Sequence, residues 1–305
     1  MRFDLEDKVV LITGGSRGLG LVMARQLIAR RARVAVCARD PDELRRARAE
    51  LDGLVTVTCD VTDADALERM VAEVTAQLGP IDCLINNAGV IQVGPMKHMT
   101  IEDYEHAMAT HFWAPLRLSL AVLPKMLERG AGRIVNIASI GGKIAVPHLL
   151  PYTASKFALV GLSEGMRAEL SKDHVLVTTV IPGLMRTGSP VNAQFKGRHH
   201  DEYAWFAAGD SSHLTAMQAE RAARQIISAM VRGTPEITLS VQAKLAVRLF
   251  ALAPSLMQHV VALIDRLLPK PGGIAEATAL GSESRRGPSL LTRASDRAAL
   301  RNNEI

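Results

Sequence analysis

Short apolar runs alternate with longer helical patterns along most of this chain. Apolar runs bounded by polar or glycine residues predict buried strands, and apolar residues at three- and four-residue spacing predict helices. The predicted helices between the strands include residues 21–27, 63–78 and 152–171. The predicted strands cover residues 8–12, 34–38, 55–59, 81–85, 134–138, 175–181 and 236–240.

This alternation predicts an α/β fold, with a doubly wound, Rossmann-like parallel sheet and helices on both faces. In such a sheet, ligands bind at the carboxyl ends of the strands. Residues that directly follow a predicted strand are therefore the first candidates for a functional site.

The first predicted strand runs into a glycine-rich turn that contains Gly14, Gly18 and Gly20. Strand, glycine turn and helix in this order are typical of a dinucleotide site. The glycines let the backbone approach a pyrophosphate, and the helix N-terminus offers it free N–H groups. The alternative is a tight turn whose glycines serve packing alone.

Tyr152 and Lys156 are four residues apart in a predicted helix, with Ser139 shortly upstream. Residues at this spacing share a helix face, so an ammonium lies beside a phenol. A free phenol ionises near pH ~10, and a neighbouring positive charge favours its anionic form. The pair therefore predicts a side chain that gives or takes a proton near neutral pH.

Together with the glycine turn, these residues resemble the short-chain dehydrogenase/reductase family over about residues 5–240. Further motifs of that family follow the later strands in order. They are Asp60-Val61, Asn87-Ala88-Gly89, Pro182-Gly183 and Thr187. The resemblance implies an oxidoreductase that transfers a hydride between a nicotinamide dinucleotide and a carbonyl or secondary alcohol.

The resemblance also implies roles for the matching positions. Tyr152 is expected to be the general acid in reduction and the base in oxidation, while Ser139 holds the carbonyl oxygen. Lys156 is expected to lower the pKa of Tyr152 and to hold the nicotinamide ribose. The residues expected to bind the dinucleotide are Gly14, Ser16, Arg17, Gly18, Leu19, Gly20, Arg39, Asp60, Val61, Asn87, Ala88, Gly89, Tyr152, Lys156, Pro182, Gly183 and Thr187.

His111 stands where the family's catalytic set usually has an Asn. That Asn holds a water that links the Lys to solvent. A His donates, accepts and relays protons and titrates near neutrality, so one hypothesis gives His111 the relay role and a pH dependence. The other makes it a neutral side chain that fills a helix kink. His111 is also the one support for a rival interpretation, an NADP-binding sensor with little catalytic activity.

Arg39 follows the second predicted strand, where a dinucleotide fold meets the adenosine ribose. An acidic residue there binds the 2′-hydroxyl, whereas an Arg accommodates a 2′-phosphate. Arg17 adds a second guanidinium, a group that matches phosphate oxygens. NADP(H) is therefore expected as the cofactor, although Asp40 or Asp42 is able to neutralise Arg39.

Composition excludes some other classes. The 305 residues are 48% hydrophobic and 22% charged, which is typical of globular proteins. The net charge of +5 is not concentrated in one run and only 4% of residues are aromatic, so nucleic-acid binding is not expected. Cys37, Cys59 and Cys83 are expected to be small buried side chains. The N-terminal residues lack a signal pattern, so a reducing cytoplasm is the expected compartment.

Residues 186–212 interrupt the strand–helix pattern and contain several aromatic residues, so a lid over the substrate is expected there. With the apolar stretch 141–151 and Met185, this lid predicts a hydrophobic substrate. His199 and His200 are adjacent, but neighbouring side chains point apart and no Cys or carboxylate cluster accompanies them, so no metal site is expected.

Residues 241–268 are apolar but are interrupted by charges and by Pro254, so they predict two short helices instead of a membrane span. Three interpretations are open: packing on the body, a homo-oligomer interface, or peripheral contact with a membrane surface. Residues 1–268 are expected to form one dinucleotide-binding and catalytic domain, and residues 269–305 a flexible tail.

Overall fold

A computed structural model describes residues 3–186, 188–211, 216–284 and 299–304 of the protein. Within these residues, a seven-stranded sheet forms the centre of the molecule, with the strand order β11-β7-β6-β4-β1-β2-β3. All of its neighbouring strands pair in parallel. The predicted doubly wound α/β sheet is thus confirmed. Its strands are β1 (Val9–Thr13), β2 (Arg33–Ala38), β3 (Val55–Thr58), β4 (Cys83–Asn86), β6 (Gly132–Ile137), β7 (Val175–Ile181) and β11 (Glu236–Thr238).

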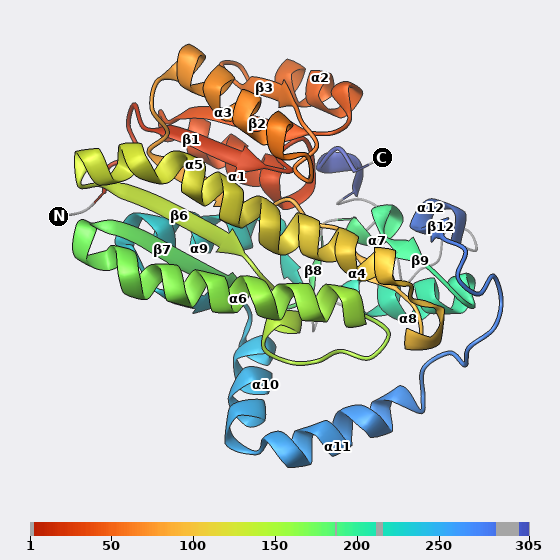
Figure 1. Ribbon diagram of the computed structural model, residues 1–305. Coiled ribbons are helices and arrows are strands. Elements are labelled where there is room, and N and C mark those ends of the chain that lie inside the picture. The colour runs from red at the N-terminus through yellow and green to blue at the C-terminus, as the bar shows by residue number, and fades with distance from the viewer. Residues whose placement is uncertain (1–2, 187, 212–215, 285–298, 305) are drawn as a thin grey trace.

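Helices cover both faces of the sheet, as Figure 1 shows. One face is packed by α1 (Gly18–Ile28), α2 (Pro41–Glu50) and α9 (Ala219–Arg232). The other is packed by α3 (Ala64–Leu78), α5 (Ala114–Arg129) and α6 (Leu150–Leu170). All five side chains of β1 are therefore buried between the two layers, and burial of such apolar surface is the dominant favourable contribution to folding.

Local signals in the sequence set the limits of the elements that carry the site. Asp40 accepts hydrogen bonds from the backbone of Asp42 and Glu43 and so caps α2, as short polar side chains do at helix N-termini. Pro151 lies in the first turn of α6, where its missing N–H has no helical partner to lose. The helix that carries Tyr152 therefore begins at Leu150, two residues before its predicted start.

The strand order of the sheet reverses direction at β1, which pairs with β2 on one side and with β4 on the other. In open α/β sheets, the crevice outside the carboxyl ends of such strands is the ligand site. The glycine turn after β1 and the Asn87 segment after β4 both face this crevice.

The segment after β7 is more regular than the sequence predicts. It contains β8 (Met185–Arg186), α7 (Ser189–Asn192), β9 (Gln194–Phe195), α8 (His199–Ser211) and β10 (Met217–Gln218). Phe195 is fully buried, and its ring lies 5.4 Å from that of Tyr203 and 6.0 Å from that of Phe206, centre to centre. These rings form a second apolar core with Val93 and Leu149.

Short elements complete the fold. β9 pairs with both β5 (Gln92–Val93) and β12 (Ala279–Leu280). The remaining helices of the body are α4 (Ile101–Met108) and α12 (Gly281–Ser284), with single turns at Met96–His98, Ile140–Gly142 and Ser171–Asp173 and a π-helical turn at Ala109–Trp113.

The two predicted helices of residues 241–268 are α10 (Val241–Leu252) and α11 (Pro254–Asp265), which stand out from the body. Ala243 is the one buried residue of α10, and α11 has none. Packing on the body, one of the three interpretations, is therefore not what the structure has. Within the described residues, every helix is too short or too polar to cross a membrane.

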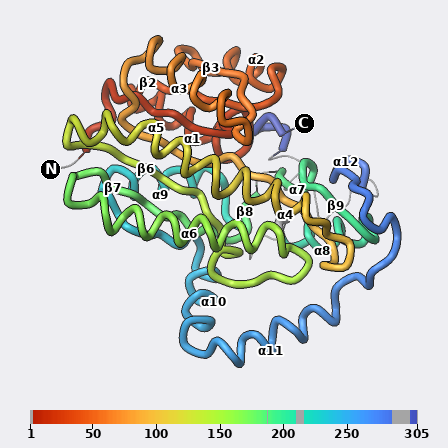
Figure 2. Tube along the Cα trace, viewed as in Figure 1, coloured from red at the N-terminus to blue at the C-terminus, as the bar shows by residue number. Residues whose placement is uncertain are grey.

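Parts of the segment 269–305, for which a flexible tail is expected, have defined places in the fold. β12 and α12 pack beside β9 and α7. Residues 299–304 lie beside α1 and α2, at the opposite end of the sequence (Figure 2).

Candidate active site

The glycine turn is held tightly against the segment that follows β4. A Cβ atom on Gly14 would lie 2.9 Å from Cα of Ala88, and one on Gly20 would lie 2.3 Å from the carbonyl oxygen of Gly14. The Asn87 side chain donates to the carbonyl oxygens of Thr13 and Gly14 at 3.0 and 2.9 Å. Gly14, Gly20 and Asn87 therefore build the turn itself.

Gly18 has a different environment. Its φ of +56° is one that L side chains rarely adopt, and the atoms that a Cβ there would meet belong to Glu304 of the distant C-terminal segment. Its N–H lies at the start of α1 and donates to the carbonyl oxygen of Asn302. Apart from that segment, Gly18 presents bare backbone at a helix N-terminus, which fits the pyrophosphate of a dinucleotide.

The side chains of Ser139 and Tyr152 both lie close to Gly141. The Ser139 hydroxyl oxygen accepts a hydrogen bond from the backbone N–H of Gly141 at 3.0 Å. A Cβ atom on Gly141 would lie 3.1 Å from Cε1 of Tyr152 and 3.5 Å from Oγ of Ser139. The end of β6 and the first turn of α6 thus bring a hydroxyl and a phenol ring to the same place.

Lys156 lies on the same helix, one turn further on, and is buried. Its Nζ donates to the carbonyl oxygen of Ile137 at 2.8 Å and lies 5.6 Å from the centre of the Tyr152 ring. Burial lowers the pKa of Lys156 from 10.5 to about 7, because a charged group is disfavoured away from water. The ammonium is thus close to losing its proton at neutral pH.

His111 is fully buried in the π-helical turn between α4 and α5, and such turns are frequent at functional sites. Its Nε2 accepts from the backbone N–H of Val90 at 3.1 Å, and its Nδ1 lies 2.7 Å from the hydroxyl oxygen of Ser155. The Ser155 proton is donated to the carbonyl oxygen of Tyr152, so Nδ1 carries the proton of the His111–Ser155 hydrogen bond.

Both ring nitrogens of His111 are thus engaged, and its ring lies edge-on to Tyr152 with centres 5.4 Å apart. Burial, with smaller contributions from the charges of Lys156 and His106, holds the pKa of His111 well below its usual value. The structure describes a neutral His that ties the helix to the Val90 backbone and to α6.

The residues expected around the adenosine lie at the ends of β2 and β3. Arg39 is exposed directly after β2. The Asp40 side chain caps α2, and Asp42 pairs with Arg45, so neither acid is paired with Arg39 within the described residues. The Asp60 carboxylate accepts from the backbone and hydroxyl of Thr62, and Val61 is buried.

Arg17 is already engaged. Its guanidinium donates to Glu43 at 2.7 Å and to the side-chain oxygen of Asn192 at 2.9 Å. The Ser16 hydroxyl also donates to Glu43 at 2.7 Å. Sequence reasoning did not anticipate Glu43 as the partner of both residues.

The remaining residues that are expected to bind the dinucleotide lie in different environments. Leu19 and Pro182 are buried, and a Cβ atom on Gly183 would contact Ser240 and Ala243 at the start of α10. Thr187 lies outside the described residues. Gly89 faces the centre of the site, because a Cβ there would lie 3.2 Å from Nε2 of His111 and 3.9 Å from Nζ of Lys156.

His199 and His200 are held by protein groups. Their Nδ1 atoms lie 3.0 Å from the hydroxyl oxygen of Ser284 and 2.7 Å from its carbonyl oxygen. Over the part of the chain that the structure describes, His, Cys, Asp and Glu side chains form no group that could hold a metal ion. Cys37, Cys59 and Cys83 are buried free thiols.

Comparison with known proteins agrees with this geometry. The model of the short chain dehydrogenase family matches residues 8–196. Drosophila melanogaster dehydrogenase/reductase SDR family protein 7-like is 32% identical over 270 residues, covering 86% of this chain and 81% of that protein.

Two solved structures share the fold. A short-chain dehydrogenase from Streptomyces avermitilis is 29% identical with a TM-score of 0.74, covering 85% of this chain and 97% of its own. A variant of actinorhodin polyketide ketoreductase with NADPH is 32% identical with a TM-score of 0.68, covering 78% and 97%. With the family's motifs gathered at one edge of a doubly wound sheet, this chain belongs to the short-chain dehydrogenase/reductase family.

Proposed function

We propose that this protein is an NADP(H)-dependent oxidoreductase that transfers a hydride between nicotinamide and the carbonyl or secondary alcohol of a hydrophobic substrate. The observation that carries the proposal is the convergence of Ser139, Tyr152 and Lys156 beside the carboxyl end of β6. A hydroxyl donor, a phenol and a buried ammonium are the groups that carbonyl reduction needs.

Each side chain has a role in the direction of reduction. Ser139 donates a hydrogen bond to the carbonyl oxygen and polarises it. Tyr152 then gives its proton to that oxygen as negative charge develops there. The Lys156 ammonium stabilises the phenolate that remains. One of its three donors binds Ile137, which leaves two for the hydroxyls of the nicotinamide ribose.

The dinucleotide, when bound, supplies or accepts the hydride. The Gly18 backbone at the start of α1 would hold its pyrophosphate at the place where Asn302 and Glu304 now lie, because a helix N-terminus offers free N–H groups. Asp60, Val61 and the Asn87–Gly89 stretch would line the adenosine, and Pro182, Gly183 and Thr187 would hold the nicotinamide side.

The preference for NADP(H) rests on Arg39. Its exposed side chain follows β2, and Asp40 and Asp42 are engaged elsewhere. An Arg at this position accommodates a 2′-phosphate. The related polyketide ketoreductase, 32% identical, has a structure with NADPH, which favours the same cofactor here.

An apolar wall beside Tyr152 favours a hydrophobic substrate. The Tyr152 ring packs against the small core that contains Leu149, Tyr203 and Phe206. Segment 186–212 would act as the lid, because α8 supplies two of these aromatic residues. A ketone on an apolar skeleton fits such surroundings better than a charged metabolite does.

The test is NADPH oxidation by the purified protein across a panel of carbonyl compounds that differ in apolar surface. We expect turnover of apolar ketones and a loss of about 10³-fold in kcat for Tyr152→Phe, in the range for a lost general acid. Cofactor binding should survive that change. A protein that binds NADPH but turns over no member of the panel would instead be the sensor of the rival interpretation.

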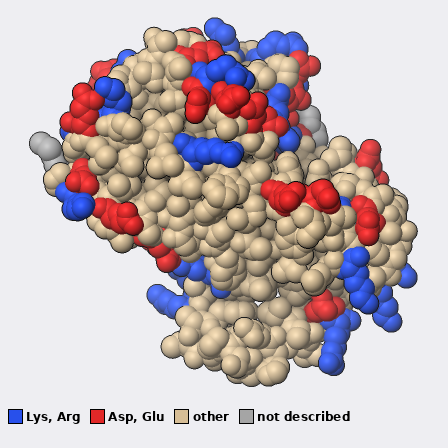
Figure 3. Space-filling view, in the orientation of Figure 1, with Lys and Arg blue, Asp and Glu red and all other residues tan. Residues whose placement is uncertain are grey.

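We also propose that α10 and α11 lie on an anionic membrane surface. Their exposed apolar side chains recur every three or four residues, and Leu252 and Leu267 are each 83% exposed. Residues 241–270, which we call the arm, have more basic than acidic residues: Lys244, Arg248, Arg266 and Lys270 against Asp265. Figure 3 shows a largely uncharged surface over this arm with charged side chains at its edges. An apolar face with basic flanks is typical of helices that bind at a bilayer interface.

Flotation with phosphatidylserine-containing vesicles tests this second proposal. Leu252→Glu with Leu267→Glu should abolish flotation, whereas Ile101→Glu, at a 68% exposed position outside the arm, should not. If the parent protein stays with the soluble fraction and sediments as a dimer that the double variant breaks, the arm is an interface between two copies and the membrane proposal fails.

A further inference from the structure

The last described residues, 299–304, return to the glycine turn after β1. The N–H of Gly18 donates to the carbonyl oxygen of Asn302 at 2.9 Å. The side chain of Asn303 donates to the carbonyl oxygens of Ser16 and Glu43 at 2.8 and 3.1 Å. Its side-chain oxygen accepts from Nε of Arg46. This segment is therefore bound by the backbone of the turn itself.

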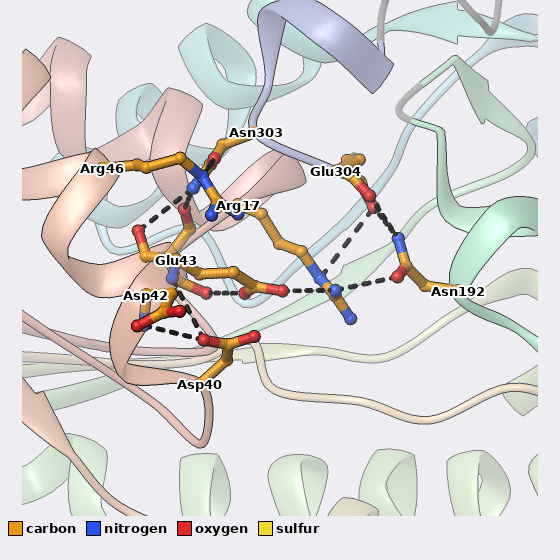
Figure 4. Close-up of polar contacts among 9 residues, drawn as sticks. Arg17, Asp40, Asp42, Glu43, Arg46, Asn192, Asn303 and Glu304 are labelled. Carbon is orange, nitrogen blue, oxygen red and sulfur yellow. Dashed lines mark hydrogen bonds and ion pairs between the residues drawn. The ribbon is translucent and has the colours of Figure 1, made fainter.

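Glu304 occupies the space in front of Gly18. One of its carboxylate oxygens lies 2.6 Å from the place where a Cβ of Gly18 would be. The other lies 4.0 Å from Nε of Arg17 and accepts from the side chain of Asn192 at 2.9 Å. Figure 4 shows Arg17 with Glu43 on one side and Glu304 with Asn192 on the other.

Ala299, at the start of this segment, packs against Gly188. It is fully buried, and a Cβ atom on Gly188 would lie 2.6 Å from Cβ of Ala299. The glycine before α7 thus leaves just enough room for this one methyl group. A larger side chain at position 299 would not fit.

We propose that residues 299–304 compete with the dinucleotide within the same chain. The glycine-rich turn binds either the cofactor or this segment, and never both at once. The inference rests on the proposed function, since it takes Gly18 as a pyrophosphate contact. A peptide carbonyl and a carboxylate sit where helix N-termini bind phosphate, and they use the same N–H and the same guanidinium.

Docking of residues 299–304 has a free-energy cost, which makes it easier for the cofactor to displace them. Both polar atoms of the buried Asn302 side chain are without a hydrogen-bond partner among the described residues. An unsatisfied buried amide weakens the state that contains it. Binding of the cofactor would release Asn302 to water, which recovers this cost.

Competition of this kind lowers the apparent affinity for the cofactor by the fraction of molecules whose site is open. If the segment is docked in about nine molecules out of ten, preventing docking tightens cofactor binding about tenfold. The size of the effect therefore measures the docking equilibrium directly.

The decisive variant is Ala299→Glu in the full chain, because the buried methyl site beside Gly188 cannot accept the longer side chain. Ala277→Glu is the matched control, since Ala277 is an exposed residue of the same C-terminal region. The dissociation constant of NADPH, measured by its fluorescence, should fall about tenfold for Ala299→Glu and stay at the parent value for Ala277→Glu.

Hydrogen exchange gives a second readout on the parent protein. Saturation with NADPH should speed exchange in the peptide that contains residues 299–304, because the cofactor displaces it. Equal dissociation constants for parent and Ala299→Glu, or unchanged protection on saturation, would overturn the inference while leaving the proposed function intact. Failure of both proteins to bind either pyridine nucleotide would instead overturn the proposed function and this inference together.

Glu304 adds a pH dependence to the contact. Burial raises its pKa from 4.5 to about 7, with Arg17 and Asn192 opposing this shift and Glu43 adding to it. The docked segment therefore binds a proton more tightly than the free one, so docking is strongest at acid pH and weakens as pH rises to 7. The ratio of parent to Ala299→Glu dissociation constants should be up to about tenfold larger at pH 6 than at pH 8. Glu304→Gln should remove that change, and an equally pH-dependent ratio in that variant would contradict the role of Glu304.

Discussion

The protonated Nδ1 of His111 lies 2.7 Å from the hydroxyl oxygen of Ser155, and that hydroxyl donates to the carbonyl oxygen of Tyr152. This relationship links the π-helical turn to the first turn of α6, which carries the proposed proton donor. Since Nε2 of His111 accepts from Val90, the ring is held at both ends. Its position favours a role in fixing the place of Tyr152 over a role in carrying protons.

The first prediction concerns the pH dependence of the reaction. Since burial holds the pKa of His111 well below its usual value, we expect the residue to stay neutral in the folded protein around neutral pH. His111→Asn should therefore give a kcat/KM profile with the same shape and inflection points as the parent profile between pH 6 and 9. A profile that loses an inflection would restore the proton-relay hypothesis.

The second prediction concerns Lys156, whose pKa is about 7 in the folded protein and 10.5 otherwise. Between these values the unfolded chain holds a proton that the folded one lacks, so this residue makes stability rise with pH. The full cost of the buried ammonium is present below pH 7 and amounts to about 5 kcal/mol at most. Lys156→Met should therefore abolish activity and yet stabilise the fold by about 2 kcal/mol at pH 6, after the lost bond to Ile137 is deducted.

Urea unfolding at pH 6 and pH 9.5 checks that prediction. The stability gain of Lys156→Met should shrink or reverse at the higher pH, since the parent Lys156 is then neutral when folded. Other ionisable groups are common to both proteins and cancel in the difference. A gain of the same size at both pH values would mean that Lys156 is not desolvated as the structure describes.

Much of the sheet was predictable because its strands are continuous apolar runs. The predicted strand 175–181 matches β7 (Val175–Ile181) at both ends, since nearly all of its residues are buried and it is bounded by His174 and by Pro182-Gly183. The predicted strand and helix also agree with the positions of Ser139, just after β6, and of Tyr152 and Lys156, one turn apart in α6.

The unpredicted parts depend on polar contacts between distant segments. The position of His111 follows from motif spacing, but its bond to Ser155 depends on a π-helical turn for which the sequence carries no periodic signal. The docking of residues 299–304 joins Asn303 to Ser16 across nearly the whole chain. Hydrophobic periodicity says nothing about such a contact, and the polar composition of this segment favoured the interpretation as a flexible tail.

The third prediction concerns cofactor choice. Arg39→Asp places an acid where the adenosine ribose is expected, so it should disfavour the 2′-phosphate and favour the 2′-hydroxyl. We expect the ratio of kcat/KM for NADPH over NADH to fall by about 100-fold, the size of one lost charged hydrogen-bond pair. Arg48→Asp makes the same charge change at an exposed position of α2 and should leave the ratio unchanged. An equal effect of both variants would reduce Arg39 to a general contribution to the surface potential.

The fourth prediction concerns the link between the proposed lid and the Tyr152 segment. Glu202 of α8 is fully buried, and its carboxylate lies 2.9 Å from Nδ1 of His148 and accepts from Nε1 of Trp205 at 2.7 Å. His148 lies just before α6, so this carboxylate ties the lid to the helix that carries Tyr152.

Glu202→Ala leaves the partly buried donors of His148 and Trp205 without their partner, at a cost of about 1–3 kcal/mol in unfolding free energy. The same loss loosens the lid, so the KM for an apolar ketone should rise about tenfold or more, while kcat changes little because Ser139, Tyr152 and Lys156 are untouched. Glu105→Ala, at an exposed position of α4, is the control and should alter neither quantity. If kcat falls in proportion to stability while KM stays constant, Glu202 supports the fold as a whole and the segment does not act as a lid.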